Sequence, residues 1–331
     1  MITAKTSIGL SHGIYDLLTN ELGVVWGMAD PILEEVPQRR TVAIPEINRT
    51  EKPAFGFRVF SGCDPDWLRR NRIDNGSRQL PFYGHEHNLY NLLPPSRYGQ
   101  HAEYYALVDG QRQVPDKDGH TPIQPCLTNP DVIQITIETV SRFFDQNPEV
   151  STYSLCPNES SKFCQCSSCL ELDNSMEAYR DRRMNSNSYF YYINTVAKEL
   201  IHSYPDRYVS AYAYWTTELP PQQIDTLPSN VVIYLTQDSS QYYDPGYEAR
   251  DYGILEMWSK VAHHLAVYDY YGLSWFTPRV YPQIVARPLR FLPTSVSKGS
   301  IVNRILTRHI LEPNSIWLPA CCGIYLSIRM D

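Results

Sequence analysis

The sequence predicts an α/β protein in which strands and helices alternate to build a (β/α)8 TIM-like barrel. Seven strand candidates alternate with helix candidates across residues 51–299, and an eighth strand is expected near Val296–Val302. A doubly wound open sheet ranks second, because no glycine-rich phosphate-binding fingerprint follows the first strand candidate. Residues 1–50 predict a partial small α+β domain. Residues 300–331 predict an atypical C-terminal segment, which is either a divergent closing helix or a disturbed segment that leaves the eighth unit incomplete.

The N-terminal segment is expected to contain one helix and two short strands. A helix is expected over Gly9–Leu22, because apolar side chains recur on one face and Gly23 follows as a terminator. Short strands are expected at Val24–Trp26 and Thr41–Ile44, where β-branched and aromatic residues gather. Glu51–Pro53 is typical of a linker into the larger domain.

The strand candidates of the large domain share short apolar and aromatic runs. They are Phe55–Phe60, Gln79–Tyr83, Ile123–Leu127, Thr152–Cys156, Tyr208–Trp215, Val231–Thr236 and His264–Asp269. The helix candidates carry apolar residues at helical spacing. They are Pro65–Arg72, Pro130–Gln146, Ser188–Ser203, Leu255–His263 and Pro282–Leu292. Repeated strand–helix units of this kind predict a parallel sheet.

The composition is that of an ordinary globular protein and argues against two classes of partner. Of the 331 residues, 43% are hydrophobic, and the net charge of −7 is unsuited to nucleic acid or to an anionic membrane surface. The sequence has no apolar run of about 18 residues, so membrane insertion is not expected. No signal peptide is recognised, because residues 1–6 lack an apolar core. The sequence assigns neither a localisation nor an oligomeric state.

An acidic residue lies beside a group of cysteines where the fourth strand candidate ends, within Leu155–Cys169. In a barrel of this type, side chains at the carboxyl ends of strands face the active-site rim. Glu159 is therefore the candidate proton donor for cleavage of a glycosidic bond. The alternative is that Glu159 only caps the next helix or pairs with a neighbouring arginine.

Glycosidic cleavage also needs a base, a nucleophile or a substrate group that stabilises the oxocarbenium-like state. Asp269, which ends an apolar strand candidate, is the main candidate for a second carboxylate. Glu218 and Asp238 are weaker candidates, because they follow their strands on loops expected to be more exposed.

Polar and aromatic side chains at the strand ends are candidates for sugar binding. The 25 tyrosines of the chain supply ring faces and hydroxyls that suit polyhydroxylated ligands. Tyr214, Trp215 and Tyr270 can stack on the apolar face of a pyranose, although core packing would claim some of these rings. His85 is expected to bind a sugar hydroxyl or to form a structural hydrogen bond. Arg70, on a helix candidate, can pair with an acidic substituent or lie on a solvated face.

The loop after the fourth strand contains three cysteines with the spacing C-x-C-x-x-C: Cys164, Cys166 and Cys169. This spacing favours metal binding over separate disulfides, and tetrahedral zinc needs a fourth ligand. Cys126, at the end of the neighbouring strand candidate, is the expected fourth ligand, with Cys156 and His120 as alternatives. Four protein ligands leave no open position, so a structural zinc ion is expected and no organic cofactor. The alternative is a set of reduced thiols, or one disulfide with a spare thiol.

Several strings of the chain together resemble a known family. They are Trp67–Arg72, Leu93–Tyr98, Gln124–Pro130, Asn158–Glu159, Phe163–Cys169, Asn194–Lys198, Ala213–Thr216, Pro220–Pro221 and Val267–Tyr271. Over residues 9–293 the chain is similar to the bacterial glycosidase-like proteins of domain-of-unknown-function family 4838. Those proteins look related to family 20 hexosaminidases and family 67 α-glucuronidases. The resemblance implies a (β/α)8 barrel, a carbohydrate-active role and a periplasmic or secreted location.

The resemblance also implies that Asn158 binds substrate beside the acid Glu159. Hexosaminidase-like barrels carry an Asp-Glu pair here, and the aspartate orients a substrate acetamide. Asn158 can still hydrogen-bond an acetamide or a hydroxyl, but an uncharged amide stabilises a developing positive charge less well. Residues 300–331 depart from the family pattern as well.

The sequence therefore predicts a glycoside hydrolase-like protein that acts on a carbohydrate, with acid catalysis from the end of the fourth strand. A catalytically inactive carbohydrate-binding barrel is the alternative from another functional class. A non-functional fragment is the third interpretation.

Overall fold

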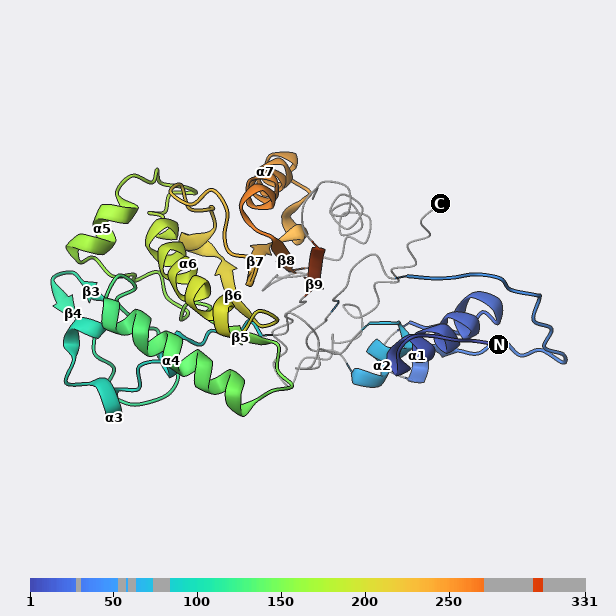
Figure 1. The fold of residues 1–331 in the computed structure, drawn as a ribbon. Helices are drawn as coiled ribbons and strands as arrows, with labels where there is room; N and C mark the ends of the chain where they lie inside the picture. Colours follow the sequence, from blue (N-terminus) through green and yellow to red (C-terminus); the bar gives the residue numbers. More distant parts are fainter. Residues whose placement is uncertain (28–30, 53–57, 59–63, 74–83, 271–299, 306–331) are drawn as a thin grey trace.

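The computed structural model describes residues 1–27, 31–52, 58, 64–73, 84–270 and 300–305. The predicted strands at Phe55–Phe60 and Gln79–Tyr83 and the predicted helix at Pro282–Leu292 fall wholly or largely outside these residues. The described part consists of a small N-terminal unit and a larger α/β unit (Figure 1).

The N-terminal unit begins with the predicted helix. The Thr6 hydroxyl caps α1, Ser7–Asp16, which continues in a wider helical turn, η1, Leu17–Glu21. The short strand β1, Val25–Trp26, then pairs antiparallel with β2, Glu34–Glu35. The predicted helix at Gly9–Leu22 and the predicted strand at Val24–Trp26 are thus both present in the structure.

The predicted strand at Thr41–Ile44 is wrong, because these residues belong to no strand. β1 pairs instead with β2, which follows the short helix η2, Pro31–Leu33. The short helix α2, Pro65–Arg70, begins where the sequence predicts, and its Trp67 and Leu68 form an apolar cluster with Val24 and Trp26. The Trp67 indole N–H donates to the carbonyl of Trp26 at 3.0 Å.

Five parallel strands form the central sheet of the larger unit, in the sequential order β5-β6-β7-β8-β9. Their bounds are Thr152–Ser154, Tyr208–Ala213, Val231–Gln237, His264–Asp269 and Ser300–Ile305. The predicted bounds of the first four strands agree with the structure to within two residues at each end. Beside β5, His87 forms a parallel bridge with Cys156, so the chain around residue 87 extends the sheet by one position.

Alternate residues of each strand face opposite sides of this sheet. One side packs against three helices: α4, Pro130–Gln146, α6, Ser186–Ser203, and α7, Pro245–Val261 (Figure 1). Its strand residues are Tyr153, Leu155, Val209, Ala211, Ala213, Val231, Ile233, Leu235, Leu265 and Val267. The other side carries a separate cluster of Cys156, Tyr212, Val232, Tyr234 and Ala266, which contains no helix residue within the described part.

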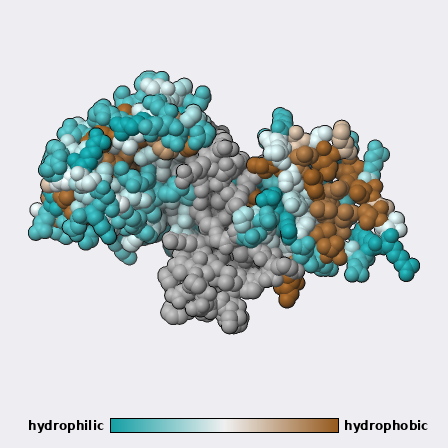
Figure 2. All heavy atoms as spheres, turned by 90° about the horizontal axis from the view of Figure 1, so that it is seen from below, coloured by the Kyte–Doolittle hydropathy of each residue, from teal (hydrophilic) through white to brown (hydrophobic). Residues whose placement is uncertain are grey.

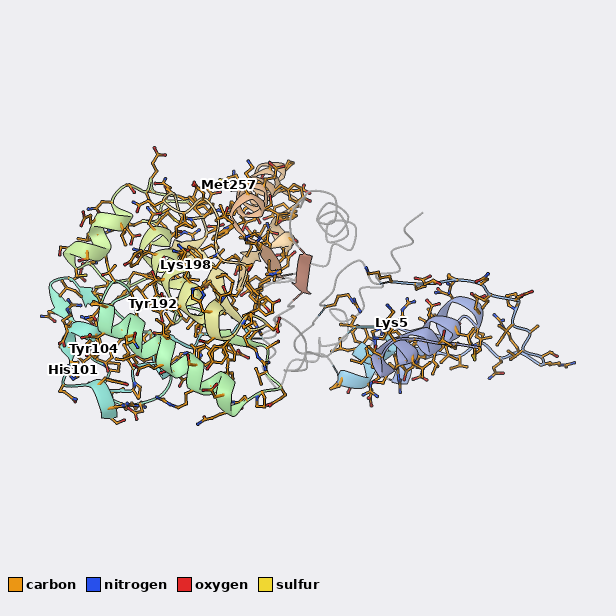
Figure 3. The ribbon with its side chains drawn as sticks, in the orientation of Figure 1. Lys5, His101, Tyr104, Tyr192, Lys198 and Met257 are labelled. Carbon is orange, nitrogen blue, oxygen red and sulfur yellow. The ribbon has the colours of Figure 1, made fainter. Side chains whose placement is uncertain are left out.

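The helices follow the amphipathic pattern of the sequence. Tyr192 on α6 is buried against α4, and its hydroxyl hydrogen-bonds with that of Thr136 at 2.8 Å (Figure 3). α7 starts ten residues before the predicted Leu255, because the Asp244 carboxylate caps its first turn and Pro245 fits the first helical position.

The predicted strand at Ile123–Leu127 is wrong, although the segment lies close to the residues after β5. It forms a single antiparallel bridge, Tyr105 to Pro125, and Pro125 has no N–H for a regular ladder. Its hydrogen bonds go to the chain near Tyr104 and Ala106 instead: Cys126 N–H donates to Tyr104 O at 2.8 Å.

The remaining short elements connect these parts. They are η3 Leu89–Asn91, α3 Pro95–Tyr98, η4 Ala102–Tyr104, β3 Leu107–Val108, β4 Gln111–Arg112, α5 Ser167–Asp173, η5 Trp215–Thr217 and η6 Ser239–Gln241. No helix in the described ranges is long and apolar enough to cross a membrane. Figure 2 shows apolar side chains gathered on the surface of the N-terminal unit, where Ile8, Leu10 and Ile14 of α1 are exposed.

Candidate functional site

Four cysteine sulfurs gather in one small volume of the larger unit. The Sγ atoms of Cys126, Cys164, Cys166 and Cys169 all lie within 4.8 Å of one another. The Cys126 sulfur lies 3.6 Å from that of Cys164 and 3.7 Å from that of Cys166. Metal–sulfur bonds of about 2.3 Å in a tetrahedral site give sulfur–sulfur edges of about 3.8 Å. This cysteine cluster is therefore close enough to bind a metal ion, with the four sulfurs that the sequence predicts.

The hairpin of β3 and β4 lies against the cysteine cluster. The Leu107 N–H donates to the Cys164 sulfur at 3.3 Å, and the Gln165 N–H donates to the Leu107 carbonyl at 2.7 Å. The Arg112 guanidinium lies 3.8 Å from the Cys164 sulfur, where its charge can offset that of a thiolate. A hydrogen bond from the Cys164 thiol lowers the pKa of Cys126, so that a thiolate forms readily there.

Glu159 lies on an exposed turn directly after the buried residue Asn158. None of the described residues hydrogen-bonds or ion-pairs with its carboxylate. The Asn158 amide is used inside the protein: its oxygen accepts the Tyr90 N–H at 2.9 Å, and its nitrogen donates to the Ile123 carbonyl at 2.5 Å. An ionised aspartate has no proton for the Ile123 carbonyl, which explains the amide at this position.

Gln124 holds the same turn from the other side. Its side-chain nitrogen donates to the Asn158 carbonyl at 2.7 Å and to the Ser160 carbonyl at 3.0 Å. Its side-chain oxygen accepts the Asn158 N–H at 3.1 Å. The backbone on both sides of Glu159 is therefore fixed by one buried glutamine.

An aromatic cluster lies on the helix-free side of the sheet, toward the carboxyl ends of its strands. Its members are His85, His87, Tyr212, Tyr214, Trp215, Tyr234, Tyr268 and Tyr270. Ring centroids of neighbouring members lie 5.2 to 6.4 Å apart. The His87 ring nitrogen Nδ1 lies 2.5 Å from the Pro157 carbonyl, two residues before Glu159. Four residues predicted to bind sugar thus lie in one cluster: His85, Tyr214, Trp215 and Tyr270.

Trp215 is the member of the aromatic cluster that is most open to solvent, with 42% of its surface exposed. Its φ of 53° lies in the left-handed region, which non-glycine residues rarely adopt. The Thr217 hydroxyl supports this turn by donating to the Tyr212 carbonyl at 3.0 Å. The Arg182 guanidinium carbon lies 6.0 Å from the centroid of the Trp215 ring.

Asp269 faces the helix-packed side of the sheet, as Leu265 and Val267 do. Its carboxylate accepts the Ser239 N–H at 2.8 Å and also the Ser239 hydroxyl. Burial raises the pKa of Asp269 to about 7. Asp269 thus joins the end of β8 to η6, and its carboxylate lies on the opposite side of the sheet from Tyr268 and the aromatic cluster.

Glu218 belongs to a second buried acidic group, which surrounds Arg180. The Arg180 guanidinium lies 3.3 Å from the Glu218 carboxylate and also pairs with Asp251 on α7. Burial raises the pKa of Glu218 to about 7, although Arg180 and Arg182 act to lower it. This network joins the loop before α6, the end of β6 and α7. Asp238, the other weaker candidate, caps η6 by accepting the Ser240 N–H at 3.2 Å.

Arg70 lies apart from these groups, on α2 in the N-terminal unit. Its guanidinium pairs with the Glu34 carboxylate at 2.9 Å. Within the described part of the chain, Arg70 has no contact with a member of the aromatic cluster.

Sequence reasoning missed three residues of this region. Gln124 stands in an apolar, proline-flanked segment, and its partners at 158 and 160 are remote in the sequence. Arg180 and Arg182 belong to a tight turn that is closed by the bridge between Tyr179 and Arg182, and its central residues Arg180 and Asp181 have φ of 50° and 57°. Two arginines around an aspartate look like a solvated surface, so no local signal identifies their role.

Comparison with known proteins gives a family for the chain. None of the curated proteins matches it. Residues 28–307 match the sequence profile of the family described as Domain of unknown function (DUF4838). That match covers well over half of the 331 residues, and the chain belongs to the DUF4838 family.

Proposed function

We propose that this protein is a glycoside hydrolase-like barrel that acts on a glycan, with Glu159 as the proton donor. The aromatic cluster is the observation that carries the proposal. It lies toward the carboxyl ends of parallel strands, where barrel enzymes hold their substrates, and it includes the exposed ring of Trp215. Aromatic rings with hydroxyls at their edges suit the apolar face and polar rim of a pyranose.

A closed (β/α)8 barrel accounts for the sheet better than a doubly wound sheet. Right-handed crossovers between strands in sequential order place all helices on one side, whereas a doubly wound sheet reverses its order and covers both sides. The order β5 to β9 is sequential, and α4, α6 and α7 share one side. The proposed relation to family 20 hexosaminidases and family 67 α-glucuronidases rests on this architecture and on the motifs of the sequence.

The roles of the polar residues follow from their contacts. Glu159 is exposed on its turn, so its carboxyl group is accessible to a leaving-group oxygen. The Asn158 side chain holds the backbone next to Glu159 in place and does not bind substrate, because its amide already hydrogen-bonds the Tyr90 N–H and the Ile123 carbonyl. Asp269 acts as a positioning residue that fixes η6, whose Ser240 N–H donates to the Tyr270 carbonyl at 3.2 Å. The group that stabilises the oxocarbenium-like state then comes from the substrate, as an acetamide can.

A substrate panel with two matched variants tests the proposal. We expect the wild-type protein to hydrolyse at least one of a set of nitrophenyl glycosides and plant or bacterial polysaccharides. Glu159→Gln should lower kcat by about 10²- to 10⁴-fold, because general acid catalysis is lost. Glu149→Gln is the control, since Glu149 is exposed before the amino end of β5, away from the carboxyl-end rim. Equal activity of Glu159→Gln and wild type would remove Glu159 from the mechanism.

A catalytically inactive carbohydrate-binding barrel is the second candidate function. The exposure of Glu159 favours it, because a general acid is usually held protonated by apolar surroundings. Calorimetric titration with the same glycans separates the two candidates. Binding that Trp215→Ala weakens, without product formation by the wild type, supports the binding protein.

We also infer that the cysteine cluster holds a structural zinc ion. The donor set fits: four soft sulfur ligands, three of them buried, with sulfur–sulfur separations of 3.6 and 3.7 Å. Cys126, Cys164, Cys166 and Cys169 would supply all four ligands. A zinc ion so enclosed supplies cross-linking of the chain and offers no open position for chemistry.

Metal analysis of the purified protein tests the zinc proposal. We expect about one zinc ion per chain, lost in Cys166→Ser and kept in Cys156→Ser. Cys156 is the matched control, because it is a buried cysteine outside the cluster. Iron in place of zinc, or a metal-free protein with four reactive thiols, would overturn the assignment.

A further inference from the structure

One side chain, that of Gln124, hydrogen-bonds the backbone on both sides of Glu159. Gln124 is fully buried, and its amide makes three hydrogen bonds to the backbone of residues 158 and 160. These bonds lie on either side of Glu159 in the chain. Inside the turn, the Ser160 hydroxyl accepts the Lys162 N–H at 3.1 Å.

No other side chain in the described ranges reaches the backbone on both sides of Glu159. The Asn158 side chain points away from the turn, toward Tyr90 and Ile123. The next anchor along the chain is Phe163, which is buried in the core against Tyr189. Between Asn158 and Phe163, the position of Glu159 therefore depends on Gln124.

We propose that Gln124 is a positioning residue for Glu159: its buried amide sets where the Glu159 carboxyl stands relative to a bound glycan. The expected effect on catalysis rests on the proposed function, in which Glu159 is the proton donor. A misplacement of about 1 Å can cost a reaction about 10²-fold, so a small shift of the turn is enough to be measured. A side chain without the amide leaves the Asn158 N–H and the Ser160 carbonyl without their Gln124 partner, while the Asn158 carbonyl keeps only the Ser160 N–H at 2.7 Å. This loss favours opening of the turn.

Gln124→Met removes the amide and keeps the length of the side chain. Gln113→Met is the matched control, because among the described residues the Gln113 amide donates only to Gln111 O, at 3.2 Å, directly after β4. Gln124→Asn, one methylene shorter, is the second variant, and it keeps a polar group in the buried position if Gln124→Met does not fold.

Two measurements are made on each variant. The first is the rate at which trypsin cuts between the exposed Lys162 and the buried Phe163, which requires the turn to open, followed by mass spectrometry. The second is kcat and KM on the substrate that the wild-type protein hydrolyses. The first readout needs no substrate, so it separates the turn from the reaction.

We expect Gln124→Met to speed cleavage at Lys162 about tenfold, the change in open population that the loss of about one net hydrogen bond or more produces. It should also lower kcat by about ten- to a hundredfold and leave KM within about twofold. Gln124→Asn should show smaller changes in the same direction, and Gln113→Met should show none.

Unchanged cleavage at Lys162 in Gln124→Met would overturn the proposal, as would faster cleavage with wild-type kcat. A fall in kcat with an equal fall in kcat of Gln113→Met would point to general destabilisation and would also overturn it. If the wild type hydrolyses no glycan, the proposed function fails separately. Faster cleavage would then keep Gln124 as the holder of the turn, and unchanged cleavage would reject that role too.

Discussion

Trp215 combines an exposed ring with a strained backbone. The φ of 53° at Trp215 destabilises a non-glycine residue by about 1–2 kcal/mol. Because 42% of the Trp215 surface is exposed, burial of the ring offsets little of this destabilisation. Such strain persists only where the surroundings impose it, and here the Thr217 hydroxyl bonds the turn. The conformation places the ring beside Tyr214 in the aromatic cluster, at a centroid distance of 6.1 Å. The proposed role in glycan binding would account for a tryptophan where glycine would fold more easily.

We expect Trp215→Gly to be more stable than Trp215→Ala by about 1 kcal/mol, because glycine adopts a positive φ freely and alanine does not. Both variants should lose affinity for the bound glycan to a similar extent, since both lack the ring. Urea denaturation measures the first difference and calorimetric titration the second. Equal stability of the two variants would mean that the turn relaxes to a negative φ when the indole is removed.

Among the elements, the sequence predicts those whose residues follow one regular period. The strands at 231–237 and 264–269 alternate between two buried sides, and the helix at 130–146 has a capping Asn129 and a proline at its first position. The segment at 123–127 has the composition of a strand but not its hydrogen bonds, because its carbonyls bond residues 106 and 158. Hydrogen bonds to residues that are remote in the sequence produce no periodic pattern of apolar and polar residues, so the sequence does not reveal them.

The same limit applies to the candidate site. Cys126 is predictable, because a tetrahedral metal site needs a fourth ligand beside three clustered cysteines, although the segment that brings residue 126 near them is not the predicted strand. The side of the sheet that Asp269 faces is also predictable. Alternate residues of a strand face the same side, and Asp269 is two residues from Val267 and four from Leu265, which face the helices. Gln124 is not, because a buried amide is recognised only by the backbone groups that it meets.

The β3–β4 hairpin is the element that should depend most on a bound metal. It has two pairs of residues and a tight turn at Asp109 and Gly110, both with positive φ, and a hairpin of this length is marginal alone. Its main attachment is to the cysteine cluster, through Leu107 N–H to the Cys164 sulfur and Gln165 N–H to Leu107 O.

Removal of the metal, by a chelator or by Cys166→Ser, should therefore raise amide hydrogen exchange in residues 107–112 and 164–169. The strands β6 to β8 should keep their protection, because their hydrogen bonds do not involve the cluster. Hydrogen exchange followed by mass spectrometry measures both regions, with Cys156→Ser as the control. Loss of protection across the whole sheet would instead make the metal a requirement for the fold.

At the scale of the whole molecule, buried carboxyl groups join the loops at one end of the sheet. Asp269 holds η6 through Ser239, and Glu218 with Asp251 surrounds Arg180. Burial raises the pKa of Asp269 and that of Glu218 to about 7. The loops at this end therefore carry groups that change charge close to neutral pH.

The sign of the resulting pH dependence follows from linkage. The pKa of Asp269 is about 7 in the folded protein and near 3.8 in the unfolded chain, so the folded state binds this proton more tightly. Its contribution to stability is fully present below about pH 4 and is lost as the pH rises through about 7. Within that window, one such group lowers the free energy of unfolding by about 1.4 kcal/mol per pH unit.

We expect Asp269→Asn to flatten this dependence, because an amide keeps an oxygen for the Ser239 N–H and has no proton to lose. The variant should be close to wild type at about pH 4 and more stable than wild type at about pH 8, where the wild-type carboxylate is buried with its charge. Urea denaturation of both proteins at several pH values in this range measures the two slopes. Parallel slopes would show that Asp269 titrates near its usual value in the folded protein. The Ser239 hydrogen bonds would then outweigh the cost of burying the charge.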